Sequence, residues 1–354
     1  MTGTAGSHRQ TPVPEYAGGL RIGRAWPRPD GTQDVEGYDG AGRLRAGTWH
    51  GAQTRLELLD FGRDAALPGL TDVLVPGAEL LVHRAGRRAV VRSGDRYVKV
   101  LRRRRAAGVA AASTRLGDVV RAAGGASATV LETRSETVVF DTVPGLPLRS
   151  LAATEDLSRW REAWDAFADT WARIAGRTPA GGHVGGPALA RHDAQAEADV
   201  VLTWAGHLRQ HDPLRLGVGG LELFDRRARL VTRELLAGDD RLVLAHRDLH
   251  DEQVLYDPAL GRIGLLDFDT AALAEPALDL GNLLAHLDLR HDQGLIGASA
   301  RDAAREILLR LAGRCGVPPA RLAAYEAASR VRLIGVYAFR PRWRGLARDW
   351  LRDG

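Results

Sequence analysis

The sequence predicts a mixed α+β protein, with short antiparallel strands in about the first 140 residues and mainly helices after them. Three observations lead to this prediction. Before residue 140, strand-like runs alternate with turn dipeptides, as at 30–31 and 39–42. After Leu151, apolar residues recur at helical spacing. One short hairpin, at 242–266, interrupts the helical part.

Composition excludes several classes of protein. The chain has 354 residues, enough for two or three structural units, and its hydrophobic content of 45% is ordinary for a globular core. A single cysteine, Cys315, excludes an internal disulfide and a cysteine zinc cluster. Residues 1–14 lack an apolar signal core, and no apolar run approaches a membrane span. We therefore expect a cytoplasmic protein without a membrane partner.

The strand-rich part divides into three segments. Residues 1–18 are predicted to be a disordered leader, and residues 19–76 a small β-rich antiparallel unit, called the cap. Residues 77–143 are predicted to form a second β unit, the N-lobe. We expect a hairpin over 79–92, a strand over 96–101, a helix over 106–123 and a second hairpin over 128–140.

Residues 144–354 are predicted to form a larger, mainly helical unit, called the C-lobe. Trp160, Trp164 and Trp171 are spaced by four and seven residues, which places them on one face of a helix over 158–175. Core packing is the expected role of that face. Further helices are predicted at 188–210, 223–237, 279–289, 301–312, 319–337 and 344–352.

The strongest chemical signal is the stretch from His246 to Gln253, followed after the hairpin by Asp267 and Asp269. It supplies a carboxylate at Asp248, an amide oxygen five residues later, and a second carboxylate at the end of an apolar strand. Phosphoryl transfer from a nucleotide needs that set: one Asp orients the attacking hydroxyl, while an amide and another Asp hold magnesium. The hairpin brings these three groups together.

These residues receive the following roles. Asp248 is predicted to orient and deprotonate the acceptor hydroxyl, because positioning is the main task in this reaction; the alternative is a surface turn residue. Gln253 and Asp267 are predicted to bind Mg²⁺, which prefers oxygen ligands. A loop-to-backbone hydrogen bond is the alternative for Gln253. Asp269 either assists the site or caps a turn, and we favour the structural role.

Two histidines and a third carboxylate surround this loop. With Asp251, His246 and His250 resemble a zinc set, but the helix and the third ligand of a catalytic zinc site are missing. We expect His246 to be buried and hydrogen-bonded behind the loop and His250 to lie near the cleft. Asp279, which follows Glu275-Pro276, is predicted to fix the loop backbone from a helix N-terminus.

The second signal is Lys99, the only lysine in the sequence; the other 48 of the 49 Lys and Arg residues are Arg. A compact ammonium in mid-strand suits nucleotide phosphates better than a planar guanidinium. A surface lysine kept by chance is the alternative. Asp118 is the only acid between Lys99 and Leu131, so it is the candidate helix partner of Lys99.

The turn of the first N-lobe hairpin, at 83–88, is the candidate phosphate-covering turn, although it has one glycine. Its backbone amides, with Arg87 or Arg88 nearby, would cradle phosphate. A plain hairpin turn is the alternative.

The motifs resemble those of the aminoglycoside phosphotransferase and choline kinase group, which has the two-lobed protein-kinase-like fold. The usual loop of that group reads His-Gly-Asp-Leu-His-x-x-Asn; here Arg247 replaces the glycine and Gln253 the asparagine. Leu266-Asp267-Phe268, Asp279-Leu280-Gly281 and the linker 143–148 also match, and the resemblance spans roughly 78–340. The cap and Gln253 loosely resemble bacterial maltokinase-type enzymes.

This resemblance implies a phosphotransferase that uses ATP or GTP and Mg²⁺ and phosphorylates a hydroxyl of a small molecule, such as a sugar, an aminoglycoside or another natural product. The backbone of Asp141, Thr142 and Val143 would contact the nucleobase. A cationic acceptor would need clustered carboxylates, and the acidic residues of this sequence are scattered. The sequence therefore does not require the acceptor to be a polycation. A peptide or protein hydroxyl kinase and a non-catalytic nucleotide-binding scaffold remain alternatives.

The formal net charge of +5 includes basic runs at 102–105 and 340–352. Nucleic-acid binding is one interpretation of these runs. No nucleic-acid motif accompanies them, so we favour a solvated surface that also attracts an anionic nucleotide. The oligomeric state stays open.

Overall fold

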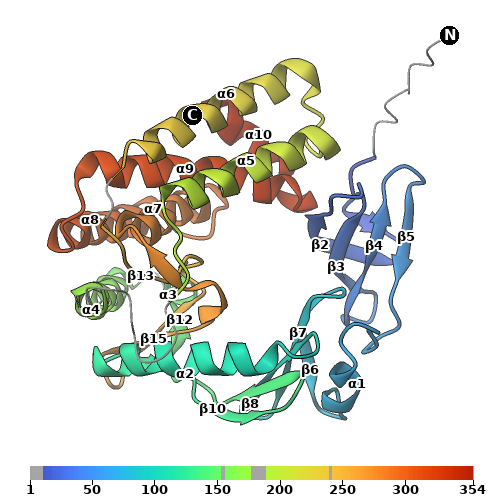
Figure 1. The fold of residues 1–354 in the computed structure, drawn as a ribbon, viewed down its shortest axis with the longest axis horizontal. Coiled ribbons are helices and arrows are strands. Elements are labelled where there is room, and N and C mark those ends of the chain that lie inside the picture. The colour runs from blue at the N-terminus through green and yellow to red at the C-terminus, as the bar shows by residue number, and fades with distance from the viewer. Residues whose placement is uncertain (1–10, 153–155, 177–188, 239–240, 354) are drawn as a thin grey trace.

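The computed structural model describes residues 11–152, 156–176, 189–238 and 241–353. The predicted α+β class is confirmed: strands dominate the first part of the chain and helices the second (Figure 1). Among the described residues, no helix combines the length and the hydropathy needed to cross a bilayer.

The cap contains one antiparallel sheet with its strands in chain order, β1 to β5. Its first strand lies within the predicted leader, and Val13 is fully buried in the same core cluster as Trp49. The indole of Trp49 donates to the carbonyl of Thr11 at 2.9 Å. The prediction of a disordered leader is therefore wrong for residues 11–18, while residues 1–10 lie outside the described part. The strands are β1 (Tyr16–Ala17), β2 (Leu20–Pro27), β3 (Gln33–Asp39), β4 (Leu44–His50) and β5 (Arg55–Leu58).

The N-lobe sheet has the order β10-β11-β8-β7-β6 and is antiparallel throughout. Lys99 therefore lies on the central strand, opposite Val90 on one side and Val138 on the other. Apolar alternation along these strands buries one face, as Val91 and Val100 show. The elements are α1 (Gly69–Val73), β6 (Glu79–Arg84), β7 (Arg88–Ser93), β8 (Arg96–Leu101), α2 (Ala106–Ala122), β10 (Val130–Thr133) and β11 (Thr137–Phe140).

The C-lobe is built from helices of the predicted order. The face of Trp160, Trp164 and Trp171 is buried, which confirms its role in the core. The carboxylate of Asp193 accepts the amide of Ala196 at 3.1 Å and so begins α5 at Ala194; the predicted start at 188 lies outside the described residues. The helices are α3 (Leu148–Ala152), α4 (Leu157–Gly176), α5 (Ala194–His211), α6 (Gly217–Leu236), α7 (Ala277–Asp292), α8 (Ala298–Arg314), α9 (Pro319–Ala338) and α10 (Arg344–Asp353).

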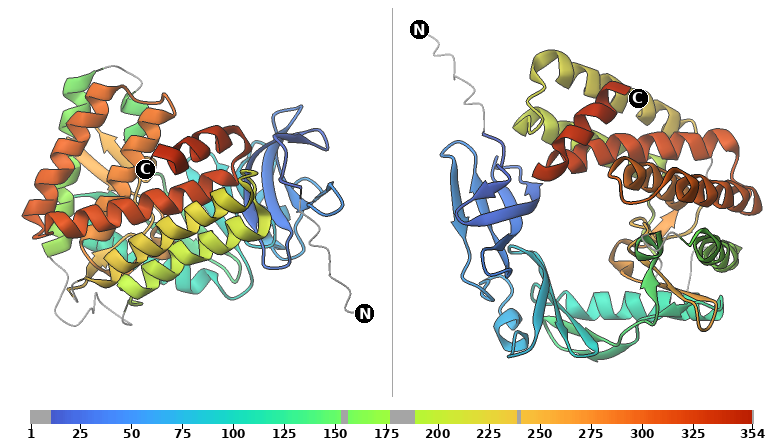
Figure 2. Two further views of the ribbon diagram at one scale, coloured as in Figure 1. Left: turned by 90° about the horizontal axis from the view of Figure 1, so that it is seen from above. Right: turned by 180° about the vertical axis from the view of Figure 1, so that it is seen from behind.

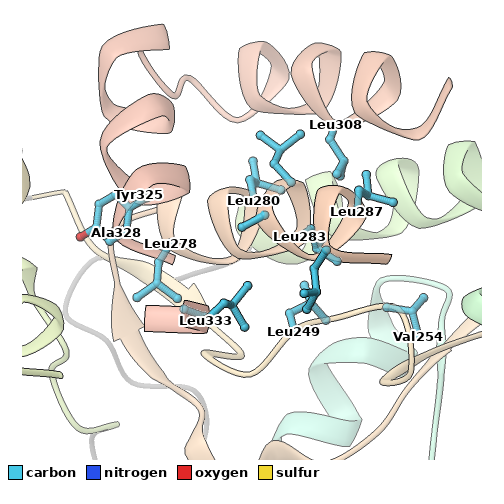
Figure 3. Close-up of a cluster of buried hydrophobic side chains, with 14 of the residues drawn as sticks. Leu249, Val254, Leu278, Leu280, Leu283, Leu287, Leu308, Tyr325, Ala328 and Leu333 are labelled. Carbon is cyan, nitrogen blue, oxygen red and sulfur yellow. The ribbon is translucent and has the colours of Figure 1, made fainter. Parts of the chain in front are cut away.

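Helix α7 is the central element of this lobe. Leu280, Leu283 and Leu287 of α7 are buried in the lobe core; Figure 3 shows Leu280 and Leu287 on the side of Leu308 of α8, and Leu283 on the side of Leu249 of the loop. Because Leu249 is fully buried, the loop between β13 and β14 is anchored to the lobe core.

Two small strand pairs frame that loop. β13 (Val243–Ala245) pairs with β16 (Ala272–Ala274), while β14 (Val254–Asp257) forms the predicted hairpin with β15 (Arg262–Leu265). β12 (Leu146–Pro147) extends this hairpin on one edge and β9 (Ala126–Ser127) on the other. The loop 246–253 joins β13 to β14, and the segment 266–271 joins β15 to β16, so both connect the same two strand pairs.

The cap contacts both lobes, and the three units follow one another around a ring (Figure 2). On the C-lobe side, the amide of Ala25 donates to the carbonyl of Phe339 at 2.9 Å, and Gln33 Nε2 lies 3.4 Å from His211 Nδ1. Cap residues such as Ile22 and Val35 also belong to the C-lobe core cluster. The N-lobe side of the cap is described with the site below.

Candidate active site

The backbone of the loop 246–253 is held in place by its neighbours. The amide of Gln253 donates to the carbonyl of His250 at 2.9 Å, which closes a turn. The carbonyl of Gln253 accepts the amide of Leu266 at 3.0 Å. Gln253 therefore lies directly opposite Leu266 and next to Asp267. The half-buried Asp248 lines the same cleft as Asp267.

Asp279, at the start of α7, fixes the beginning of this loop. Its carboxylate accepts the amides of His246 and Arg247 at 2.7 and 2.8 Å, and the residue is 2% exposed. Burial raises the pKa of Asp279, although the two amides and nearby His246 act in the opposite direction. The arrangement holds Arg247 in a left-handed conformation, with φ of 70°.

Lys99 is 9% exposed and reaches across the cleft to two carboxylates of the C-lobe. Its Nζ lies 2.9 Å from Asp267 Oδ1 and 2.7 Å from Asp269 Oδ1. Arg88 Nη1 lies 3.8 Å from Asp267 and 3.5 Å from Asp269. Burial alone would raise the pKa of Asp267, but Lys99 and Arg88 outweigh it and hold that pKa below its usual range.

Asp118 lies elsewhere. Its carboxylate is 68% exposed and pairs with Arg121, one turn along α2, at 2.7 Å. The expected pairing of Asp118 with Lys99 is therefore absent from this structure. Asp118 is on the solvent-facing side of α2, so its carboxylate points away from the cleft. Its short side chain cannot reach back to Lys99. Lys99 instead has the two carboxylates from the C-lobe.

The cleft lined by Asp267 and Asp269, the two partners of Lys99, has a volume of about 600 Å³. Asp248, Asp267 and Asp269 line it on the C-lobe side, and the exposed Arg87 lies at its edge. Six arginines line it in all, against three carboxylates, so the cleft has a cationic wall facing an acidic one. This pattern suits a polyphosphate bound beside a divalent cation. The arginines are Arg84, Arg87, Arg88, Arg102, Arg103 and Arg105.

Cap residues hold the turn between β6 and β7, which carries Arg84, Arg87 and Arg88. The carboxylate of Asp64 accepts the amide of Gly86 at 2.7 Å and lies 3.1 Å from the ring of His83. The carboxylate of Glu36 accepts the amide of His83 at 2.7 Å. The cap thus bonds this hairpin at Gly86, in the turn between β6 and β7, and at His83, near the end of β6. No sequence pattern predicts these contacts, because they join segments that are not neighbours in the chain.

The segment after β11 connects the lobes. The amide of Asp141 donates to the carbonyl of Thr129 at 3.1 Å, so strand pairing already uses this donor. The hydroxyl of Thr142 donates to the carbonyl of Asp95 at 2.5 Å. Val143 is 7% exposed and faces Gly264, where a side chain would collide with it. These contacts fix the segment where nucleobase contacts are expected.

The two histidines differ in environment. His246 is 2% exposed and donates from Nε2 to the carbonyl of Leu266 at 2.7 Å. His250 Nδ1 accepts the amide of Glu252 at 3.2 Å, and its ring stacks on His286 at 5.1 Å. Burial lowers the pKa of His250, so the neutral ring is favoured.

Sequence reasoning missed a further support of the loop. Asn282 donates from Nδ2 to the carbonyl of Leu249 at 2.8 Å and accepts from Arg332 at 2.5 Å. The position of Asn282, three residues after Asp279 on α7, is the signal that could have found it, since both side chains then face the loop. Asp251 likewise pairs with the buried Arg290.

The chain belongs to the phosphotransferase enzyme family, whose model it matches over residues 75–324. It is accordingly a phosphotransferase. No curated protein matches the sequence.

Three solved structures resemble the chain. One is an aminoglycoside phosphotransferase from Streptomyces rimosus with ADP and streptomycin: TM-score 0.50, 23% identity, 74% of this chain and 95% of that one covered. Another is the GDP and kanamycin complex of APH(2")-IIia, with TM-score 0.52, 15% identity and 80% and 94% coverage. A third is an ethanolamine kinase from Plasmodium vivax, with TM-score 0.50, 11% identity and 80% and 85% coverage. At these identities the likeness shows the fold alone.

Proposed function

We propose that this phosphotransferase moves the γ-phosphate of ATP to a hydroxyl group of a small molecule with the help of Mg²⁺. The observation that carries the proposal is the convergence of Lys99 with Asp267, in a cleft that Asp248 also lines. An ammonium from one lobe meeting carboxylates of the other is the arrangement that a nucleotide triphosphate between them requires.

The residues present fit a magnesium ion. The backbone of Gln253 is bonded to Leu266, the residue before Asp267, so its amide side chain comes from a neighbouring position; of the two Asp267 oxygens, Oδ1 binds Lys99 and Oδ2 lies 3.8 Å from Arg88. Mg²⁺ needs few protein ligands because phosphate and water complete its shell. When bound, the ion would neutralise charge on the phosphates. Until a nucleotide binds, Asp267 and Asp269 give Lys99 the anionic oxygens that the phosphates would later provide.

Asp248 would accept a hydrogen bond from the acceptor hydroxyl and receive its proton as the new phosphate ester forms. Asp279 and Leu249 would act by holding the loop: one fixes its backbone amides and the other anchors it in the core. The cleft arginines would bind the triphosphate. Bound ADP and GDP are found in the similar structures, and this supports nucleotide use by the present chain.

Steady-state formation of ADP tests the proposal. We expect Asp248→Asn to reduce kcat by about 100-fold or more while nucleotide affinity is kept. Lys99→Met should raise KM for ATP as well as lower kcat, because it removes the ammonium from the phosphate site. Asp118→Asn is the control, since Asp118 is exposed and paired within α2. Equal rates for wild type and Asp248→Asn would instead favour a non-catalytic nucleotide-binding scaffold.

A further inference from the structure

A second cavity, of about 570 Å³, adjoins the same loop. Glu252 lines it, and the rest of its wall comes from α3, the end of α7, and the segment from α9 to the following turn. We call it the arginine cavity, because Arg149, Arg290, Arg340 and Arg342 line it. Asp248 and Glu252 are four residues apart, so their Cα atoms are at most about 14 Å apart. A molecule of one or two sugar rings spans that distance.

Two of the four guanidinium groups are neutralised by the loop. Arg290 Nε donates to both oxygens of Asp251, at 3.1 and 2.9 Å, and both residues are buried. Arg149 pairs with Glu252. Burial would raise the pKa of Glu252, but Arg290 and Arg149 outweigh it and hold that pKa below its usual range. These pairs hold the cavity wall in place, and they leave little positive charge on Arg149 and Arg290 to attract a ligand.

Arg340 and Arg342 have no such partner. Within the described ranges, no carboxylate lies within 4.0 Å of either guanidinium. Four guanidiniums against the two carboxylates, Asp251 and Glu252, leave an excess of two positive charges.

Arg340 is held against the ring of Tyr337, with its guanidinium carbon 4.2 Å from the ring centre. Burial lowers the pKa of Arg340, as do Arg24 of the cap and Arg290, while Tyr337 and Glu252 act in the opposite direction without outweighing them. A partly desolvated cation with other cations nearby costs free energy, and an anion that joins it reduces this cost. Trp343, on the same wall, offers an apolar face beside these charges.

We infer that the arginine cavity binds the phosphate acceptor and selects one that carries anionic oxygens, as a carboxylate or a phosphate group. The inference rests on the proposed function and names its substrate class. Arg340 and Arg342 would bind the anionic group bidentately, Trp343 would pack against the sugar-like body, and a hydroxyl would extend toward Asp248. Polycationic acceptors are disfavoured by the same charges.

Binding and turnover together test the inference. Calorimetric titrations use the full chain with ADP and Mg²⁺, and four probes of one size class: glucuronate, glucose 6-phosphate, glucose and glucosamine. We expect at least one anionic probe to bind about tenfold or more tightly than glucose, and Arg340→Gln to remove most of that advantage. Glucuronate and glucose 6-phosphate distinguish a carboxylate from a phosphate ligand. Arg352→Gln, at a side chain 73% exposed, is the matched control.

Each outcome decides the question. Unchanged ADP affinity in Arg340→Gln shows that the variant is folded, so a lost preference reports on the cavity. Three results would each overturn the inference. Glucose or glucosamine could bind as tightly as both anionic probes, or Arg340→Gln could keep the wild-type preference. In the third, no anionic probe would bind with a dissociation constant below about 10 mM. Failure of the proposed function is separate: it would appear as ADP formation that Asp248→Asn does not reduce, whatever the probes bind.

Discussion

Arg247 has a positive φ of 70° at a loop position where the motif of related enzymes has glycine. For a residue with a Cβ, this conformation costs about 1–2 kcal/mol. The side chain recovers part of the cost, because Arg247 Nη1 donates to the carbonyl of Thr270 at 3.1 Å. The exact loop conformation is therefore maintained by Asp279 rather than by the preference of the residue itself.

This strain gives a prediction. Arg247→Gly and Arg247→Ala both lose the bond to Thr270, but only glycine removes the strain, at the expense of a more flexible unfolded chain. We expect the glycine variant to be more stable than the alanine variant by about 1 kcal/mol. Urea unfolding measures the difference. An alanine variant at least as stable as the glycine variant would show that the loop carries no strain here.

At the scale of elements, the turn between β6 and β7 depends on the cap. Asp64→Asn weakens the acceptor of the Gly86 amide and the contact with His83. We expect KM for ATP to rise about threefold to tenfold, because the loss of one or two hydrogen bonds loosens the phosphate-covering turn. Asp60→Asn, at an exposed position of the same segment, should leave KM unchanged. If KM for ATP were the same in Asp64→Asn and Asp60→Asn, the contacts of Asp64 with the turn would have no role in nucleotide binding.

Packing of α7 against α9 is equally specific. A Cβ on Gly281 would lie 2.7 Å from the backbone nitrogen of Glu326, whereas one on Gly313 of α8 would meet nothing within 4 Å. Gly281→Ala should therefore destabilise the chain by about 1–3 kcal/mol. Gly313→Ala should be neutral or stabilise by up to about 1 kcal/mol. Thermal unfolding of the two variants compares them directly; a tolerated alanine at 281 would mean that α9 can shift.

The sequence predicted those parts of the site that adjacent residues determine. Turn residues between β14 and β15 set the hairpin, and the hairpin register places Gln253 beside Asp267. The partner of Lys99 depends on how the lobes meet, so local sequence favours Asp118 and does not predict the pairing of Lys99 with Asp269. The cap contacts with Gly86 and His83, and the wall of the arginine cavity, also join distant segments. Such contacts leave no pattern in a single sequence.

At the scale of the molecule, the cap and the C-lobe meet at His211. The ring is 2% exposed and lies edge-on against Phe339, with centres 5.6 Å apart. Burial, followed by the charge of His207, lowers the pKa of His211 to about 4, while a hydrogen bond with the backbone of Arg28 and the charge of Asp30 act in the opposite direction. His211 is therefore neutral at this contact over most of the acidic range.

The folded chain binds fewer protons at His211 than the unfolded chain between pH 4 and the unfolded value of 6.5. The contribution of the neutral His211 ring to the free energy of unfolding is therefore complete above pH 6.5 and declines as the pH falls toward 4. We expect the melting temperature of His211→Gln to fall less steeply with acidification than that of wild type. His291→Gln, far along the C-lobe, is the control. Parallel curves for wild type and His211→Gln would mean that another group governs the acid response.

The attachment of the cap at two places has a mechanical consequence. Two bodies joined by one hinge swing freely, but three bodies joined in a circle form a closed linkage. Any rotation about the segment 141–147 that moves the lobes apart must stretch the bonds of Ala25 and Gln33 or bend the sheet between them. Such a rotation would also have to separate the apolar core that Ile22 and Val35 share with the C-lobe, so the cap limits how far the two lobes can move apart.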